Sequence, residues 1–232
     1  YVIETAGQSP LRFELDTAPP VAGDDRELGV CLRSARTIDD PASADRIRRS
    51  LANLLLNERE FIGGADRLTS TPPKLRIDLH AECNIKPPCV YCEWDHNKRL
   101  ERGHRIALER DGVEPLGAFY DQAASLNDCS YSEPMAGPAT AELIARFHAD
   151  GKPLEVTCNG QVLGPAQRRQ LLGKEVMLYI SLDSADPAWY RKYRNDRLGV
   201  VVRNLRDLCR ERKSHDGLPR VALSYIAMRS NI

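Results

Sequence analysis

The sequence has no net charge and no long apolar run, and each absence excludes a class of partner. Its 33 Lys and Arg residues balance its 33 Asp and Glu residues, so the formal net charge is zero. Without an excess of positive charge, the chain is not expected to hold a nucleic acid by bulk electrostatics. Without a stretch of about 20 apolar residues, it is not expected to span a membrane.

The cysteines do not form the pattern of a disulfide scaffold. They number seven, which is odd, and a chain of 232 residues is long for a fold held by bridges. Three of them, Cys83, Cys89 and Cys92, lie within ten positions, right after an expected strand. Clustered cysteines in such a chain hold metal more often than they form bridges, so we expect a metal centre and a reducing compartment, the cytoplasm. The other four are expected to be small buried residues: Cys31, Cys129, Cys158 and Cys209.

The chain divides into three segments. Residues 1–40 contain two expected strands separated by a polar turn and predict a partial β-strand module. Residues 41–73 predict a helical linker, because apolar residues recur there at helical spacing, with Ser43 or Asp45 as the expected cap. Residues 74–232 form the third segment, which stops right after its last expected strand and leaves open whether the sheet is complete.

Short β-branched runs alternate with amphipathic stretches throughout the third segment. Strands are expected at 75–83, 129–132, 153–160, 175–184 and 220–231. Helices are expected at 114–128, 139–151, 164–174, 187–196 and 201–217. Strand and helix in turn predict βαβ units and a parallel sheet. The expected fold is α/β, a partial (β/α) TIM-like barrel preceded by a small β-rich plus helical N-terminal segment.

Polar residues fall at the C-terminal end of every expected strand. In chain order they are Cys83, then Ser132 and Glu133, then Asn159, then Ser181 and Asp183, and then Asn231. The C-terminal ends of parallel strands meet at one edge, where α/β folds build their sites. The sequence therefore predicts a functional site at that edge.

Three cysteines in one loop leave two kinds of metal centre open. Thiolates are soft ligands that suit zinc or an iron–sulfur cluster. A structural zinc ion normally takes four protein ligands, and His96, four positions after Cys92, is a candidate for the fourth. A four-iron cluster held by three cysteines would instead keep one iron open to a small molecule.

The cysteine loop and the motifs after it resemble the radical S-adenosylmethionine (SAM) superfamily over about residues 75–232. Members of that family bind a 4Fe–4S cluster through three cysteines, and SAM chelates the fourth iron. Here five residues separate Cys83 from Cys89, where three are usual, and two separate Cys89 from Cys92, as is usual. The resemblance implies that these three cysteines are the cluster ligands and that Tyr91 lies against the adenine of SAM.

Two further motifs resemble the family's, and they imply contacts to the SAM amino group and a third residue that faces the site. The segment YSEPMAG resembles the family's Gly-Gly-Glu-Pro motif, with Tyr131 and Ser132 in place of the glycines. It implies that Ser132 and Glu133 bind near the SAM amino group, and a carboxylate suits an ammonium. The segment TCNG resembles the end of the family's third strand and implies that Asn159 faces the site.

The last two motifs imply contacts to the rest of SAM. The segment ISLDS resembles the end of the fourth strand, where Ser181 and Asp183 would reach the ribose or the methionine part. In WYRKYRND, Arg194 falls where some members place an arginine on the SAM carboxylate, with Arg191 as its rival. Each of these residues also has a plain structural role open to it, such as the NG turn for Asn159 or a helix cap for Asp183.

The resemblance implies an enzyme that cleaves SAM reductively and uses a 5′-deoxyadenosyl radical to take hydrogen from a substrate C–H bond. The expected partners are a reductant protein of flavodoxin or ferredoxin type and a small-molecule, saccharide or peptide substrate. Residues 23–39 loosely resemble small β-modules found beside sugar-modifying and methyl-transferring enzymes, which favours a saccharide. The sequence identifies no catalytic residue. A zinc-stabilised α/β binding module and a degenerate family member acting as a scaffold stay as alternatives.

Overall fold

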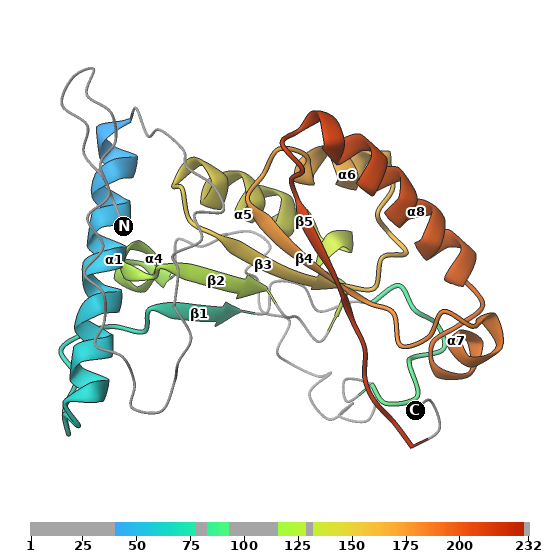
Figure 1. Cartoon of the computed structure of the whole chain (residues 1–232), viewed down its shortest axis with the longest axis horizontal. Coiled ribbons are helices and arrows are strands. Elements are labelled where there is room, and N and C mark those ends of the chain that lie inside the picture. Colours follow the sequence, from blue (N-terminus) through green and yellow to red (C-terminus); the bar gives the residue numbers. More distant parts are fainter. Residues whose placement is uncertain (1–39, 78–82, 93–115, 129–131, 230–232) are drawn as a thin grey trace, which may run out of the picture.

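The computed structural model describes residues 40–77, 83–92, 116–128 and 132–229, and within them it contains one parallel sheet of five strands in the order β1-β2-β3-β4-β5 (Figure 1). The strands are β1 (Lys74–Ile77), β2 (Ser125–Asp128), β3 (Leu154–Cys158), β4 (Val176–Ser181) and β5 (Arg220–Ser224). Every neighbouring pair is parallel. The expected α/β fold, a partial β/α barrel, is confirmed.

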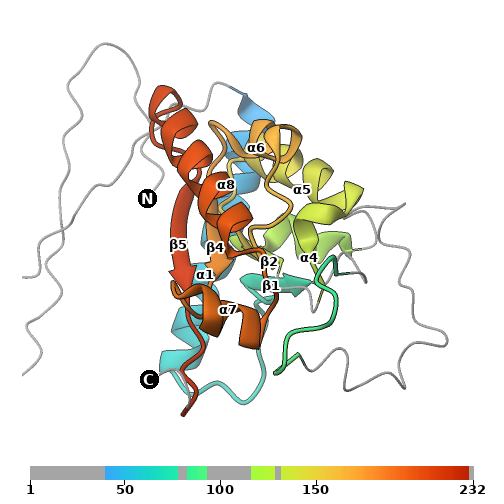
Figure 2. The ribbon, with the colours of Figure 1, turned by 90° about the vertical axis from the view of Figure 1, so that its right-hand side faces the viewer.

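Helices connect the strands and lie against the sheet. They are α1 (Pro41–Ile62), α4 (Ala118–Gln122), η3 (Pro134–Ala136), α5 (Pro138–Ala149), α6 (Pro165–Leu171), α7 (Pro187–Tyr193), α8 (Leu198–Glu211) and η4 (Arg212–Ser214). Figures 1 and 2 show α5, α6 and α8 on the same side of the sheet. In Figure 1, α1 lies at the N-terminal ends of the strands, whereas α7 lies toward their C-terminal ends.

The second strand is not where the sequence pattern predicts it. Residues 114–128 are expected to be one helix, but α4 ends at Gln122 and β2 occupies Ser125–Asp128. The tetrapeptide SLND is extended because it pairs with both β1 and β3 and alternates its burial, with Leu126 and Asp128 inside. Pairing on both sides outweighs the weak strand propensity of these residues.

Several other expectations concern residues outside the described ranges. The N-terminal module lies there almost entirely, together with Cys31, Cys129, Tyr131, His96 and Asn231. The first strand is predicted at 75–83, whereas in the described residues β1 covers Lys74–Ile77. Cys83 is not part of a strand.

The core lies between β2–β4 and the helices that cover them. Alternate residues of β3 and β4 point into it, including Val156, Leu178 and Ile180, which have no exposed surface. Helix α5 contributes Phe147 and α8 contributes Val201 to the same cluster. Burial of this kind stabilises by about 25 cal/mol per Å² of apolar surface. A slip of one residue would turn these side chains to the opposite face of the sheet, so the alternation specifies the register of the strands.

Two of the cysteines can be compared with the expectation of burial. Cys158 belongs to the core and is 2% exposed, as predicted. Cys209, on α8, is only partly buried, so the prediction is not met in full there. Both carry free thiols.

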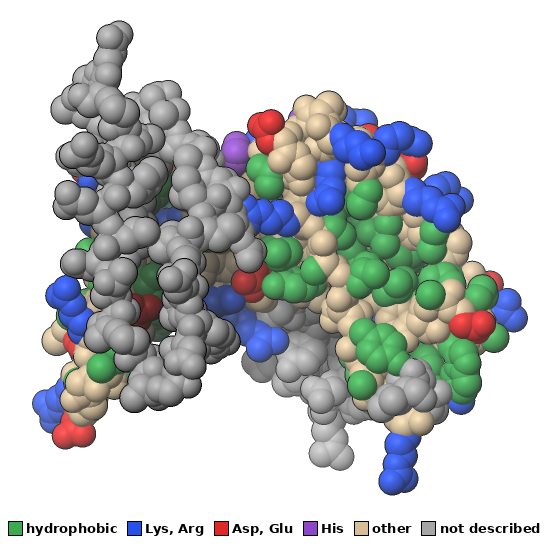
Figure 3. Space-filling model, viewed as in Figure 1, with side chains coloured by type: hydrophobic (Ala, Val, Ile, Leu, Met, Phe, Trp, Pro, Cys, Tyr) green, Lys and Arg blue, Asp and Glu red, His purple; other side chains and the backbone are tan. Residues whose placement is uncertain are grey.

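Strand β5 is at one end of the strand order in the described residues, so the sheet is open on that side. Leu223, Tyr225 and Ile226 are exposed there. Figure 3 shows hydrophobic side chains gathered on the face that carries β5, with Lys and Arg side chains around them.

Helix α1 is capped by a residue that precedes both of the predicted caps. Asp40 is the N-cap, and its carboxylate accepts hydrogen bonds from the backbone N–H groups of Ala42 and Ser43. The predicted caps, Ser43 and Asp45, do not fill that role. Ser43 is buried instead, and its hydroxyl donates to the carbonyl of Ala149 at 3.1 Å.

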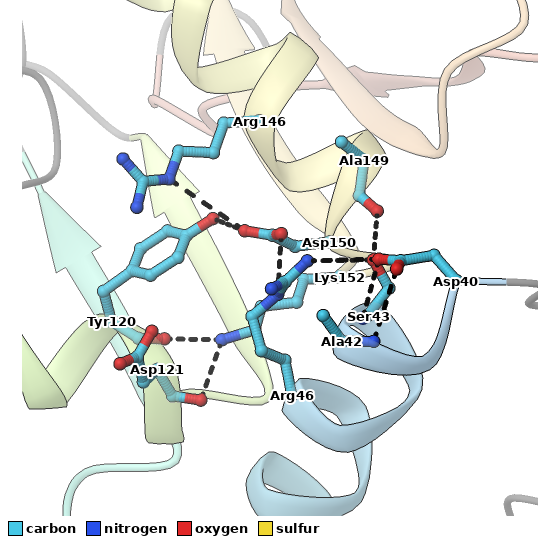
Figure 4. Close-up of polar contacts among 10 residues, drawn as sticks. All are labelled: Asp40, Ala42, Ser43, Arg46, Tyr120, Asp121, Arg146, Ala149, Asp150 and Lys152. Atoms are coloured by element: carbon cyan, nitrogen blue, oxygen red, sulfur yellow. Dashed lines mark hydrogen bonds and ion pairs between the residues drawn. The ribbon is translucent and has the colours of Figure 1, made fainter.

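Polar contacts hold α1 against the N-terminal end of the sheet (Figure 4). Asp150 is the centre of this cluster, because Arg46 Nε lies 2.9 Å from its Oδ1 and Tyr120 donates to its Oδ2 at 2.5 Å. Buried Lys152 donates to the carbonyls of Tyr120 and Asp121 beside it. Asp150 is only 8% exposed, so water cannot easily replace its carboxylate. Removing it would leave the guanidinium of Arg46 and the hydroxyl of Tyr120 without their acceptor.

Asp150→Ala is therefore expected to lower the free energy of unfolding by about 2–4 kcal/mol, which corresponds to a fall in melting temperature of about 5–15 °C. The matched control is Asp45→Ala, which removes an exposed ion pair with Arg48 on the same helix. That change is expected to cost less than about 0.5 kcal/mol. Equal melting temperatures for the two variants would contradict this role of Asp150.

Candidate functional site

The loop that carries the three cysteines lies close to α7, toward the C-terminal ends of the strands (Figure 1). Cys83, Cys89 and Cys92 are half-buried and carry free thiols. The backbone N–H of Cys92 donates to the carbonyl of Cys89 at 2.9 Å, which closes a turn between them. Burial raises the pKa of Cys89 to about 11, and burial also raises the pKa of Cys83.

The donor set of this loop fits an iron–sulfur cluster. Thiols with raised pKa values stay protonated at neutral pH unless a cation holds them as thiolates. Among the residues that the structure describes, no three His, Cys, Asp or Glu side chains are gathered closely enough to hold a single metal ion. A four-iron cluster takes each sulfur on a separate iron, and the three thiols of this loop could supply three such ligands.

Glu133 is a buried carboxylate between the ends of β2 and β3. It is 1% exposed and accepts hydrogen bonds from the backbone N–H of Asn159 at 2.7 Å and from that of Met135 at 3.2 Å. It also caps η3, so the Pro134 that follows it stands at the first position of that turn. Burial raises the pKa of Glu133 to about 7, although its two backbone donors act to lower it.

Asn159 joins the end of β3 to the cysteine loop. Its Nδ2 donates to Oδ1 of Asn84 at 2.8 Å and lies 3.9 Å from the sulfur of Cys83. Its Oδ1 accepts from the N–H of Gln161, which closes the turn through Gly160. Gly160 has φ of +75°, and a Cβ there would lie 3.0 Å from Val201. Asn159 therefore shapes a turn and faces the site at once.

Asp183 follows β4 and is enclosed. Its Oδ2 accepts from Tyr91 and from Nε of Arg194, the latter at 2.6 Å, and its Oδ1 accepts from the N–H of Ile226 at 3.1 Å. The guanidinium of Arg194 lies 5.6 Å from the centre of the Tyr91 ring. A residue of the cysteine loop is thus tied to the ends of β4 and α7.

Both predicted serines are half-buried, whereas only one of the two candidate arginines contacts the site. Ser181 is the last residue of β4 and is half-buried, and Ser132 is half-buried just before Glu133. Of the two arginines, Arg194 contacts the site, whereas Arg191 is exposed and lines a groove between α7 and α8 of about 560 Å³.

Sequence reasoning missed a set of amides behind the cysteine loop. Gln161 Nε2 donates to Oδ1 of Asn195 at 2.8 Å and to the hydroxyl of Tyr190 at 3.3 Å. Asn84 reaches this set through Gln161 at 3.4 Å. The position of Asn84 right after Cys83 was the available signal, because groups next to a metal ligand commonly orient it.

The chain is similar to known proteins in its three-dimensional structure but not detectably in its sequence. No protein-family model matches the chain, and no curated protein matches it. The crystal structure of Streptococcus suis SuiB matches with a TM-score of 0.53 and 12% identity, over 83% of this chain and 50% of that one. SuiB bound to S-adenosylmethionine matches with a TM-score of 0.55 and 15% identity, over 81% of this chain and 44% of that one. TYW1 with a lysine-pyruvate adduct has a TM-score of 0.43, at 20% identity over 69% of this chain and 55% of that one.

The likeness to SuiB establishes a common fold. The chain spans about half the length of the SuiB structures it matches. No helix in the part of the chain that the structure describes is long and apolar enough to cross a membrane. The chain thus has, over about four-fifths of its length, the fold of a protein that has been crystallised with S-adenosylmethionine.

Proposed function

We propose that the chain is the core of a radical SAM enzyme. The observation that carries the proposal is the meeting, at the C-terminal edge of one parallel sheet, of a three-cysteine loop with the ends of β3 and β4. Asn159 contacts the loop from β3 and Asp183 contacts it from the end of β4. The fold shared with SAM-bound SuiB supports the same conclusion.

The cluster ligands in this proposal are Cys83, Cys89 and Cys92. They leave one iron of a 4Fe–4S cluster without a protein ligand, which is the position that the amino and carboxylate groups of SAM would take. When bound in its reduced state, such a cluster would supply one electron to SAM, and the cleavage would give methionine and a 5′-deoxyadenosyl radical able to take hydrogen from a substrate C–H bond. The chain itself identifies no further catalytic residue.

The protein's own contribution is to bind, orient and exclude water. Glu133, held by two backbone N–H groups, presents a buried carboxylate suited to the SAM ammonium. The ring of Tyr91 is proposed to lie against the adenine, and Asn159, Ser132 and Ser181 to line the site around the ribose and methionine.

Asp183 and Arg194 are proposed to belong to the SAM site as well. The resemblance assigns Asp183 to the ribose or methionine part and Arg194 to the SAM carboxylate. Both side chains are buried and bonded to each other, at 2.6 Å between Arg194 Nε and Asp183 Oδ2. Because these contacts also reach Tyr91, they favour an action on SAM through the cysteine loop.

The partners and the location are proposed with the activity. A reductant protein of flavodoxin or ferredoxin type would supply the electron, and the cytoplasm would keep the thiols reduced. A small molecule, a saccharide and a peptide all stay open as substrates, because the residues that favour a saccharide, 23–39, lie outside the described ranges.

Anaerobic reconstitution with iron and sulfide tests this proposal. The expected product has about four irons per chain, broad visible absorption that dithionite bleaches, and release of 5′-deoxyadenosine from SAM under reducing conditions. A colourless chain with one zinc ion would instead establish the zinc-stabilised module. A bleachable cluster without any SAM cleavage would establish the scaffold alternative, and either result overturns the proposed activity.

A further inference from the structure

The cysteine loop is bonded at two consecutive residues, Val90 and Tyr91, to the end of α7 and to the residue Asp183 that follows β4. The N–H of Val90 donates to the carbonyl of Tyr193 at 3.0 Å, and the hydroxyl of Tyr91 donates to Asp183. Both residues stand between Cys89 and Cys92. Any movement of this part of the loop would therefore have to break a contact to Asp183 or to the end of α7.

The carboxylate of Asp183 is enclosed by the protein and bonded through both of its oxygens. Its side chain has 0% exposure and that of Arg194 has 5%, and both of its carboxylate oxygens accept hydrogen bonds. Because the side chain has no exposed surface, a ligand could reach this carboxylate only if the groups around it moved. Removing one partner of a buried, hydrogen-bonded ion pair is strongly destabilising, because it leaves the other charge unpaired.

The backbone of Asp183 supports the same view. Its φ is 37°, in the left-handed region, which is uncommon for a residue other than glycine. Such a conformation persists where the surroundings over-determine it, and it is concentrated at functional sites. Here Tyr91, Arg194 and the N–H of Ile226 hold the side chain from three directions.

We propose that Asp183 is a positioning residue that, with Arg194 behind it, holds Tyr91 and so places Cys89 and Cys92 before any cluster binds. This proposal rests on the proposed function in one respect only, namely that the group bound by these thiols is an iron–sulfur cluster. A loop ordered in advance loses less conformational freedom on binding, so the cluster is held more tightly. The role differs from direct SAM contact, which the resemblance implies for these residues.

The same arrangement occurs at the opposite end of the sheet and provides a matched control. There Tyr120 donates to buried Asp150, which also pairs with Arg46, and none of the residues that join this group in Figure 4 is a cysteine. Tyr91→Phe and Tyr120→Phe therefore each delete one phenolic hydroxyl from a Tyr–Asp–Arg group. They differ in that only the first touches the cysteine loop.

Thiol labelling of the cluster-free full chain tests the proposal. With iodoacetamide and peptide mass spectrometry, Tyr91→Phe is expected to speed the labelling of Cys89 and Cys92 about tenfold, because the loop opens more often. Tyr120→Phe is expected to lower the melting temperature but to leave that labelling unchanged. Labelling of the Tyr91→Phe chain at the wild-type rate overturns the proposal. So does equal acceleration by Tyr120→Phe, which would indicate general loosening.

A second variant and a second measurement separate positioning from SAM contact. Asp183→Asn, which keeps the shape of the side chain, is expected to speed labelling as Tyr91→Phe does and to speed iron loss from the loaded chain to a chelator. If it weakens SAM binding while labelling and iron loss stay at wild-type rates, the residue acts on SAM directly and the proposal fails. The labelling experiment uses neither cluster nor SAM, so it can succeed where the proposed function fails. If the wild-type chain takes up no cluster but the variants are still labelled faster, the positioning role stands and only the proposed function is contradicted.

Discussion

Replacement of Cys89 by alanine is expected to abolish both cluster retention and SAM cleavage. Two thiolates from one loop cannot hold a four-iron cluster that lacks a fourth protein ligand, and the SAM-binding iron is lost with it. The measurements are iron per chain after anaerobic reconstitution and 5′-deoxyadenosine released under dithionite. The expected values are a loss of most of the iron and a fall of cleavage to background.

The control for this variant is Cys209→Ala. Cys209 is also a partly buried free thiol, but it lies on α8, away from the cysteine loop. Its replacement is expected to leave iron content and cleavage at wild-type values. Intact SAM cleavage by reconstituted Cys89→Ala would contradict the cluster assignment.

Glu133→Gln is expected to weaken SAM binding and to reduce the loss of stability of the cofactor-free chain at alkaline pH. Loss of the carboxylate would remove the proposed charge-assisted bond to the SAM ammonium, and such a bond is worth about 1.5–3 kcal/mol, or roughly 10- to 100-fold in affinity. Glu142→Gln, a change on α5 outside the site, is the matched control and is expected to leave SAM affinity unchanged. Equilibrium binding of SAM to the loaded chain measures the difference.

The stability effect of Glu133→Gln follows from the direction in which the pKa of Glu133 moves on folding. Burial raises this pKa from 4.5 to about 7, so the folded chain binds the proton more tightly than the unfolded chain does. The stability from the protonated form is fully present below pH 4.5 and is lost as the pH rises through 7. At pH 8 the ionised carboxylate costs about 3 kcal/mol, because a tenfold change in proton affinity corresponds to about 1.4 kcal/mol.

Urea unfolding of the cofactor-free chain at pH 4.5 and at pH 8 measures this. Through this group the wild type is expected to be up to about 3 kcal/mol less stable at pH 8 than at pH 4.5, whereas Glu133→Gln, which cannot ionise, is expected to lack that part of the pH dependence. The glutamine amide has one acceptor oxygen for the two backbone N–H groups, which lowers stability equally at both pH values. A free energy of unfolding that falls from pH 4.5 to pH 8 as steeply in Glu133→Gln as in the wild type would show that the ionised carboxylate is well compensated in the folded chain. A buried group that is costly for folding but retained is the pattern expected of a binding site.

Local patterns in the sequence determined the fold class and indicated the sheet edge at which the site is proposed. The β-branched runs at 153–160 and 175–184 became β3 and β4, because alternating burial needs only the order of residues along one strand. The helices at 139–151 and 187–196 followed for the same reason, since helical periodicity is read within one segment. Three thiols in one loop are likewise visible from spacing alone.

Long-range pairing decided what the local pattern could not. The residues SLND form β2 because strands on both sides supply their partners, and Asp40 rather than Ser43 caps α1 because Ser43 reaches Ala149 on another element. The bonds of Asp183 join residues 92 and 11 positions away, Tyr91 and Arg194. Sequence spacing carries no information about such distances, because the order of strands in the sheet determines which strand ends become neighbours.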